Sequence, residues 1–474
     1  MAEMNLAIGR GLGLPISRSI SHPVPLFTKV NTYALLMALF LYATEGAFLV
    51  PSMEEHAKGA ATVVGATAAT GPLHLLELAL AFAISLKVIL SSWRAVASMS
   101  VKMKLFSTSA LLATLSCLWS VDPLLSLRSG LYLIINTLFM YHLVQRFSLQ
   151  ELMRLMIAAG VVVAMMSITT AIVLPSYAWG SAGTHIALQG AFIAKNVLGN
   201  VAVFLLTPAL FVRGMRLRVR AAYILVMLVL ILLSFSLQAW AAAFFCFCYA
   251  LICLLLGRLS KKEAKWIAFV TLLPVVVATV FLMTYRTEIL EFLGKDPTLS
   301  GRTIIWSAVL RSILKRPMLG WGYNAFWQGF TGESGLVLLQ VNFPIAQSQN
   351  GVLEVLLGLG GVGVALVLAT FLQGLRNAVK CFRLGATEAA RWYLLIALLT
   401  IGYSVGEANL QQPNILPWMM YIMACTGLAA EVRRARRDRE ATQESAKLQT
   451  HGPRWNDAIK LAASLLFERQ SKGL

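Results

Sequence analysis

Long apolar runs alternate with short polar segments along almost the whole chain. The runs carry almost no charge and are about 20 residues long, enough for an α-helix to cross a hydrocarbon core of about 30 Å. The pattern predicts an all-α polytopic membrane protein with about twelve transmembrane helices. These helices are expected near residues 33–51, 72–90, 105–121, 129–147, 153–174, 191–212, 221–236, 238–257, 266–284, 350–372, 392–408 and 414–430.

Basic side chains gather in the segments that join alternate pairs of predicted helices. Because positively charged loops stay on the cytoplasmic face of a membrane, this distribution predicts one cytoplasmic face that also holds both termini. The basic clusters are Arg94, Lys102 and Lys104; Arg146 and Arg154; Arg213 to Arg220; Arg258 to Lys265; Arg376 to Arg391; and Arg433 to Arg439.

The chain divides into three predicted parts. Segment 1–32 is expected to be cytoplasmic, since it has no apolar run long enough for a signal-peptide core. Segment 33–430 is the membrane domain. Segment 431–474 is expected to be a cytoplasmic tail, in which a charged linker leads to an amphipathic helix that binds the membrane surface or a cytoplasmic partner.

Composition agrees with a membrane protein and removes other classes. Hydrophobic residues make up 58% of the 474 residues and charged residues 13%, far more apolar surface than a soluble domain needs. The net charge of +19 comes from the basic clusters, so it gives no reason to expect a nucleic-acid partner. No His, Cys or Asp-x-Asp pattern has the spacing of a metal site. We therefore expect no bound metal and no cofactor.

One polar stretch differs from the rest, the predicted outer loop 285–349. It interleaves basic with aromatic side chains, including Arg302, Arg311, Trp321 and Tyr323. Guanidinium groups bind phosphate oxygens and flat rings pack against sugars, so the stretch suits a sugar attached to a phosphate. An ordinary extramembrane loop would also contain glycine, proline and charges, and composition alone does not separate the two interpretations.

Residues 302–316 of this loop have apolar side chains at helical spacing, followed by Pro317 and Gly320, which stop a helix. We expect an amphipathic helix that lies along the outer membrane surface with its basic face toward water or lipid headgroups. Its apolar residues are Ile305, Trp306, Val309, Leu310 and Ile313.

Five ionisable residues fall in or at the ends of apolar runs, where charge costs a few kcal/mol. Glu45 and Glu77 are most simply read as end residues or packing ion pairs. Lys195 is different, because it lies near the outer end of a predicted span beside Asn196 and beyond His185. Lys195 would face the same compartment as Arg302, and the two cations would clamp a diphosphate. The other two ionisable residues are Glu354 and Glu407.

Several ordered segments resemble the O-antigen ligase and polymerase superfamily, especially its ExoQ-like branch of exopolysaccharide polymerases. The most specific is "LSGRTIIWSAVLRSILKRPMLGWGYNAFW" at 299–327. The others are "WSVDPLLSLR" at 119–128, "LQGAFIAKNVLGN" at 188–200, "SQNGVLEVLLGLGGVG" at 348–363 and "SVGEANL" at 404–410.

The resemblance implies a metal-independent, inverting glycosyltransferase in the bacterial inner membrane. Its donor would be an undecaprenyl-diphosphate-linked oligosaccharide at the periplasmic face, delivered by a flippase and extended beside a polysaccharide co-polymerase. A polymerase uses the next lipid-linked repeat as acceptor, whereas a ligase uses lipid A core. A transporter or flippase, and a catalytically silent relative that acts as an assembly partner, remain alternatives.

By position, the resemblance assigns Arg302 to the diphosphate and Lys195 with Asn196 to the donor site. It puts Asn350 and Glu354 in the cleft below the long loop. Further candidates for substrate binding are His185, Arg311, Trp321, Tyr323 and Glu407.

Two positions depart from the family pattern. The family usually has a histidine where this chain has Gln349, and glutamine cannot take a proton at neutral pH. The family also commonly has Arg or Lys in the Ser-x-Ser turn, where this chain offers Leu237 or Gln238. Either Glu354, Glu407 or His185 replaces the missing base, or the protein is slow, specialised or inactive.

Overall fold

The computed structural model of the chain describes residues 86, 87, 90, 93–182, 185–192, 194–256, 302–342 and 345–451. The elements before the long loop are α5 (Trp93–Lys102), α6 (Lys104–Leu115), η2 (Ser116–Leu118), α7 (Pro123–Arg146), α8 (Leu149–Val173), α9 (Pro175–Ala178), β1 (Trp179–Ala182), β2 (His185–Leu188), α10 (Lys195–Phe211), α11 (Leu217–Leu233) and α12 (Leu237–Leu256). Those that follow are α15 (Arg302–Lys315), α16 (Gly332–Val341), α17 (Gly351–Leu384), α18 (Thr387–Tyr403) and α19 (Leu416–His451).

The described residues are mostly helical, consistent with a polytopic membrane protein. Among them, four helices are long and apolar enough to cross a membrane, α7, α8, α12 and α17, or up to five if α5 and α6, bent by 97°, form one broken span. About twelve spans are therefore not confirmed. The predicted spans near 33–51 and 266–284, and most of 72–90, lie outside the described residues, as do Glu45 and Glu77.

Local sequence signals set several helix ends. Asp122 caps α7 by accepting a hydrogen bond from the Leu125 amide, and Pro123 follows at the first helical position. Ser148 and Glu151 form a capping box at the start of α8. Gly385 ends α17 with a φ of 89°, the left-handed conformation that glycine adopts without strain.

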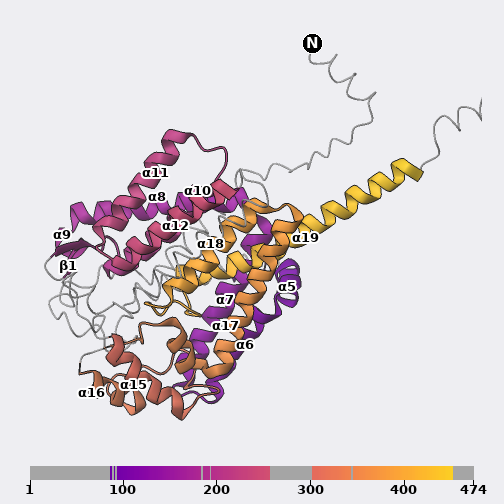
Figure 1. Ribbon diagram of the computed structural model, residues 1–474. Coiled ribbons are helices and arrows are strands. Elements are labelled where there is room, and N and C mark those ends of the chain that lie inside the picture. The colour runs from indigo at the N-terminus through magenta and orange to yellow at the C-terminus, as the bar shows by residue number, and fades with distance from the viewer. Residues whose placement is uncertain are drawn as a thin grey trace, which may run out of the picture.

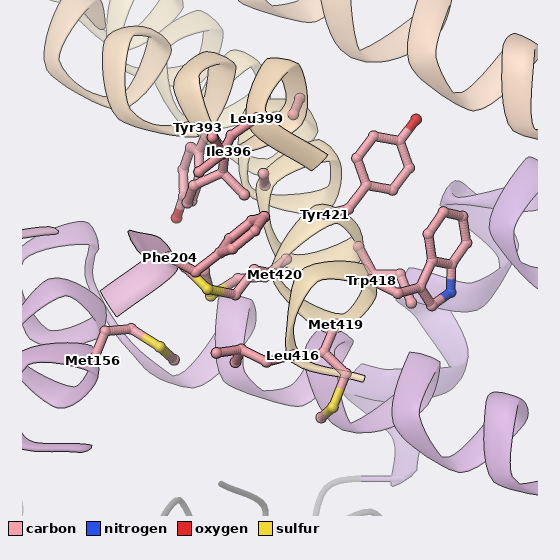
Figure 2. Close-up of a cluster of buried hydrophobic side chains, with 14 of the residues drawn as sticks. Met156, Phe204, Tyr393, Ile396, Leu399, Leu416, Trp418, Met419, Met420 and Tyr421 are labelled. Carbon is pink, nitrogen blue, oxygen red and sulfur yellow. The ribbon is translucent and has the colours of Figure 1, made fainter. Parts of the chain in front are cut away.

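The first half of α19 is the centre of the core. It packs against α7, α17 and α18, and its buried side chains run from Leu416 to Val432. Figure 2 shows how residues of α19 meet Phe204 from α10 and Tyr393 from α18. Because α10 and α18 are each 17 residues long, their length alone is marginal for a span, and this packing fixes their place in the bundle.

Basic loops from four places meet at one end of the bundle, which we call the basic end. The Nε atom of Arg213, after α10, lies 3.2 Å from Glu388 at the start of α18. Arg434 and Arg439 of α19 donate to the carbonyls of Val144 and Arg383. The contacts bring together segments that the charge pattern had assigned to one face of the membrane.

From the basic end, α19 continues outward as a single helix (Figure 1). Residues 431–451, the predicted charged linker, are helical, because their alanine, arginine and glutamate residues favour helix and extend one that the core already holds. The predicted amphipathic helix of the tail lies outside the described residues.

The opposite end of the bundle carries α15 and α16, and we call it the loop end (Figure 1). Here the segment after α15 binds the turn before α7. The Trp119 indole donates to the Leu319 carbonyl at 2.9 Å, and the Val121 amide donates to the Trp321 carbonyl at 3.0 Å. The part of the polar stretch that follows α15 is thus anchored on a turn about 200 residues earlier in the chain.

Candidate functional site

A break in α17 receives the segment that follows α15. Gly360 has φ 64° and ψ −160°, so the helix is interrupted there and backbone groups on both sides become available. The amides of Trp321 and Gly322 donate to the carbonyls of Leu357 and Gly358 at 2.7 and 3.0 Å. In the other direction, the Gly361 amide donates to the Pro317 carbonyl at 2.8 Å. We call these backbone hydrogen bonds between residues 317–322 and α17 the lock. They fix the loop end against α17.

The helix predicted at residues 302–316 is present as α15, and its place along the outer membrane surface stays a prediction. Ile305, Val309 and Ile313 are buried against α16 and α17, as the spacing indicated. Leu310, predicted beside them, is exposed. The apolar face of α15 is therefore covered by protein, which holds Arg302, on the same helix, in a defined place.

Arg302 is the centre of the polar site. Its Nε atom donates to Gln349 Oε1 at 2.9 Å, and one terminal nitrogen lies 3.5 Å from Glu407 Oε1. The Arg302 and Glu407 side chains keep 24% and 18% exposure, so both are reachable from solvent. The guanidinium is thus a reachable cation that can bind phosphate oxygens.

The side-chain orientation of Gln349 follows from its partner. The Nε of arginine only donates, so the atom that it contacts must be the amide oxygen of Gln349. The NH₂ group of Gln349 is then the end that can donate to a substrate. Gln349 also has a φ of 52°, a left-handed conformation imposed by the turn into α17.

Gln238 lies beside the Arg302 guanidinium. A Cβ atom placed on Gly406 would lie 3.0 Å from Gln238 Oε1 and 3.2 Å from Arg302 Nη1, so both side chains close around this glycine. Gln238 also donates to the Tyr403 carbonyl at 2.7 Å. Of the two residues that the sequence offered in this turn, Gln238 therefore faces the site, whereas the neighbouring Leu237 is 54% exposed.

Asn350 joins α17 to the loop after α18. Its Oδ1 atom accepts from the amides of Val352 and Leu353 and so caps α17, while its Nδ2 donates to the Val405 carbonyl at 3.1 Å. The Gly351 amide donates to the Ser404 carbonyl at 2.7 Å. These bonds hold the loop that carries Glu407 next to the turn that carries Gln349.

Glu354 supports that turn from below. The carboxylate is buried, and its two oxygens accept from the Trp327 indole and the Ser348 amide, each at 2.9 Å. Trp306 adds a hydrogen bond to the Ser348 carbonyl at 3.1 Å. Both carboxylate oxygens of Glu354 are therefore used to hold Trp327 and Ser348, which precedes Gln349. Glu354 also lines a small cavity beneath the loop with Tyr323 and Gln411.

Glu354→Gln is expected to loosen this turn. A carboxylate accepts from both donors, whereas an amide presents its own NH₂ to one of them, so a buried donor loses its partner. We expect a loss of about 1–3 kcal/mol in stability, measured as a lower Tm of the purified protein in detergent. Trp327→Phe removes one of the same two bonds and serves as the matched variant. An unchanged Tm in Glu354→Gln would contradict the supporting role.

Lys195 and Arg302 begin helices at the same end of the bundle. Lys195 starts α10, which runs toward Arg213 at the basic end, so Lys195 lies at the loop end. One turn later, Gly199 packs on Ser234 and Ala239, which flank the turn into α12 that carries Gln238. Asn196, beside Lys195, is exposed.

The remaining candidates lie elsewhere on the loop end or have other partners. His185 begins β2, paired with Ala182 of β1 in an antiparallel hairpin. Tyr323 is buried, and its hydroxyl donates to the Gln411 carbonyl. The Trp321 indole donates to the Ser312 carbonyl, while Arg316 stacks on its ring at 4.3 Å. Tyr323 and Trp321 thus hold the loop together.

Arg311 is exposed and follows Arg302 by nine residues on α15. Nine residues make two and a half turns, so Arg311 projects from the opposite face of the helix, about 13 Å further along its axis. It does not join the cluster around Arg302. Among the described residues, no group of three His, Cys, Asp or Glu side chains forms a candidate metal site.

The close approach of Gln238 and Arg302 to Gly406, and the pairing of Arg302 with Glu407, were not predicted from the sequence. The available signal was the "SVGEANL" segment just after a predicted helix. Nothing in its composition indicates that it meets a residue more than 100 positions earlier.

Residues 222–368 match the family model described as O-antigen ligase. The chain is also 26% identical over 231 residues to the exopolysaccharide production protein ExoQ of Rhizobium meliloti (strain 1021), a region that is 46% of this chain and 52% of ExoQ. The chain thus spans about half the length of this curated relative. The resemblance to the superfamily is confirmed. The family match includes Gln238, Arg302 and Gln349, whereas Lys195 and Glu407 fall outside it.

Proposed function

We propose that this protein is a polysaccharide polymerase of the inner membrane. In this proposal it transfers an oligosaccharide from undecaprenyl diphosphate to the next lipid-linked repeat unit at the periplasmic face. The likeness to O-antigen ligases and to ExoQ supports the general class of reaction. The arrangement around Arg302 supports the departure of the diphosphate from the sugar in this reaction.

The observation that carries the proposal is the position of Arg302. Its guanidinium is held by Gln349 and Glu407 at the end of the bundle opposite the basic clusters, with part of the side chain open to solvent. A guanidinium carries five N–H donors, so after these two contacts others remain for phosphate oxygens. A fixed cation at this place would stabilise the diphosphate as its sugar departs.

Lys195 would supply a second positive charge, because it begins α10 at the same end of the bundle. The Gln349 and Gln238 amides would donate or accept hydrogen bonds where the family usually has titratable or charged side chains. In this arrangement the protein's own cations take the role that a divalent metal has in many sugar transferases.

The test is chain extension by the purified protein. The protein in lipid nanodiscs is given defined undecaprenyl-diphosphate-linked repeat units, and products are separated by size. Products of two or more repeats support a polymerase. No extension of a verified cognate substrate, under conditions in which a related polymerase extends it, would refute the proposal.

The family model's description also favours a ligase, which would use lipid A core as acceptor. Supplying both acceptors in one reaction separates the two activities, since a ligase leaves the lipid-linked repeats unextended and labels lipid A core. Movement of lipid-linked sugar across liposomes without glycosyl transfer would instead indicate a flippase.

The proposal requires the loop end to face the periplasm and the basic end the cytoplasm. Ser307 on α15 and Thr442 on α19 are both exposed. In spheroplasts, a membrane-impermeant maleimide is expected to label Ser307→Cys without permeabilisation, and to label Thr442→Cys only after it. Wild-type protein gives the background from the native cysteines. The reverse labelling pattern would contradict this orientation.

A further inference from the structure

We propose that the small cavity beneath the long loop binds one alkali-metal cation, with Glu354 and Gln411 as its principal ligands. The cavity lies between residues 323–326, the first turns of α17 and residues 410–412 after α18. Its volume of about 10 Å³ is close to the least space that holds one water-sized guest. A dehydrated Na⁺ or K⁺ is of that size or smaller, so the cavity has room for a single ion.

The first observation is a buried negative charge without a basic partner. The Glu354 carboxylate is buried and accepts from two neutral donors, the Trp327 indole and the Ser348 amide. None of the ion pairs in the described part of the chain includes Glu354. Buried carboxylates are ordinarily paired with a basic side chain or bound to a metal, because hydration is costly to lose. A carboxylate has about four lone-pair sites, so sites remain for an ion after these two bonds.

The second observation is an oxygen without a partner on a residue that lines the same cavity. Gln411 is 1% exposed, and its Nε2 donates to Ser109 Oγ at 2.6 Å. Its Oε1 accepts no hydrogen bond. A buried acceptor of this kind costs about 1–3 kcal/mol unless it finds a partner. A cation in the cavity would satisfy this oxygen and the Glu354 charge together.

Gln411 is also held in place as a ligand should be. Its backbone carbonyl accepts from the Tyr323 hydroxyl, and its φ of 56° is a left-handed conformation set by the turn after α18. The amide bond to Ser109 fixes the far end of the side chain. Because both ends are held, the oxygen needs little rearrangement to bind an ion.

The chemistry of the lining favours a monovalent ion. Besides Glu354 and Gln411, the residues with side-chain oxygens around the cavity are Asn324 and Gln412. Carboxylate and amide oxygens suit hard cations, and one carboxylate balances one positive charge. Ca²⁺ and Mg²⁺ need more oxygens or several waters, for which this cavity is too small. The proposal departs from the sequence-based expectation of no bound metal, which rested on motif spacing along the chain.

An ion here would join three parts of the loop end. Asn324 follows the lock, Glu354 supports the turn that carries Gln349, and Gln411 follows the segment that carries Glu407. The ion would hold these segments together from beneath, on the side away from solvent. Because it would bind the folded state and not the unfolded chain, it would raise the stability in proportion to its occupancy.

The test is thermal unfolding of the full-length protein in detergent, in NaCl, KCl or choline chloride at one ionic strength. Choline is too large for the cavity. We expect the Tm to rise by about 2 °C or more, and to saturate, as Na⁺ or K⁺ replaces choline. The comparison of NaCl with KCl identifies the preferred ion. Calorimetric titration of that salt into protein in choline chloride should give one site per chain. Equal Tm values in the three salts would overturn the proposal.

Variants of the lining locate the ion. Glu354→Gln should abolish the cation-dependent rise in Tm, because it removes the charge. Gln411→Met removes the unpartnered oxygen and should weaken cation affinity by about tenfold or more. It decides the question if Glu354→Gln does not fold. A rise in Tm that persists unchanged in either variant would place the ion elsewhere and refute this site.

Two controls separate ion binding from general stability. Ser109→Ala removes the partner of the Gln411 NH₂ group but no oxygen of the cavity lining, so it should lower the Tm equally in all three salts. Glu333→Gln removes a carboxylate that pairs with Lys315 at the same end of the bundle, and the cation-dependent rise should remain. No glycosyl substrate is needed, so failure here is distinct from failure of the proposed function.

Discussion

Arg302→Ala is expected to abolish chain extension, with a loss of about 10³-fold or more in turnover. The substitution removes the cation that would face the leaving diphosphate. It also removes the partner of both Gln349 and Glu407 and leaves their polar groups at the site without their common donor. The measurement is the initial rate of repeat-unit extension, with undecaprenyl diphosphate binding as the second readout. Both should fall.

Two further variants sharpen this prediction. Arg302→Lys keeps the positive charge, but an ammonium group cannot contact Gln349 and Glu407 through a rigid planar fork, so we expect partial activity. Lys315→Ala removes a basic residue from the same helix and should leave the rate nearly unchanged, since its exposed pair with Glu333 contributes at most about 1 kcal/mol. Full activity in Arg302→Ala would remove Arg302 from the proposed mechanism.

Gly360→Ala is expected to give the largest loss of stability. Gly360 has a backbone conformation that is almost restricted to glycine, and strain there costs about 1–3 kcal/mol for another residue. An added Cβ would also lie 2.3 Å from the carbonyl carbon of Met318. The helix and the 317–322 segment would have to separate, breaking the hydrogen bonds between Trp321 and Leu357 and between Gly361 and Pro317.

We therefore expect Gly360→Ala to lower the yield of folded protein and its Tm in detergent, and to inactivate it although no polar site residue changes. Gly402→Ala is the control, because Gly402 lies in α18 with ordinary backbone angles and open space around it. It should be neutral or slightly stabilising. A Gly360→Ala protein with wild-type Tm and activity would show that the lock is not needed.

The glycines of this region illustrate what sequence patterns leave unexplained. Gly360 stood out only as part of a segment that resembles a family, and Gly320 only as a helix stop in another such segment. In the structure they let two backbones approach: a Cβ on Gly320 would lie 2.5 Å from the Leu357 carbonyl oxygen. A requirement of this kind depends on a neighbour in space, so it has no signature in hydrophobic periodicity.

Other parts of the site were accessible from the sequence. Arg302 stood out because a cation in a polar stretch rich in aromatic residues suits a phosphorylated sugar. The helix that it begins followed from the spacing of Ile305, Val309 and Ile313. Glu354, in contrast, was predicted to line the cleft as a catalytic carboxylate, and its two hydrogen bonds to Trp327 and Ser348 became evident only from the fold.

The amino-acid sequence was enough to predict the class of protein, most of the helices that the structure describes, and the gathering of basic residues at one end of the bundle. These properties depend on apolar periodicity, helix caps and charge, which act over a few neighbouring residues. Which polar residues meet becomes evident only from the packing of the helices. Arg302, Gln349 and Glu407 come from three separate segments, and the packing of α15, α17 and α18 brings them together. Such contacts close loops of about 50 to 100 residues, and their geometry is fixed by the packed helices between them, not by the local sequence.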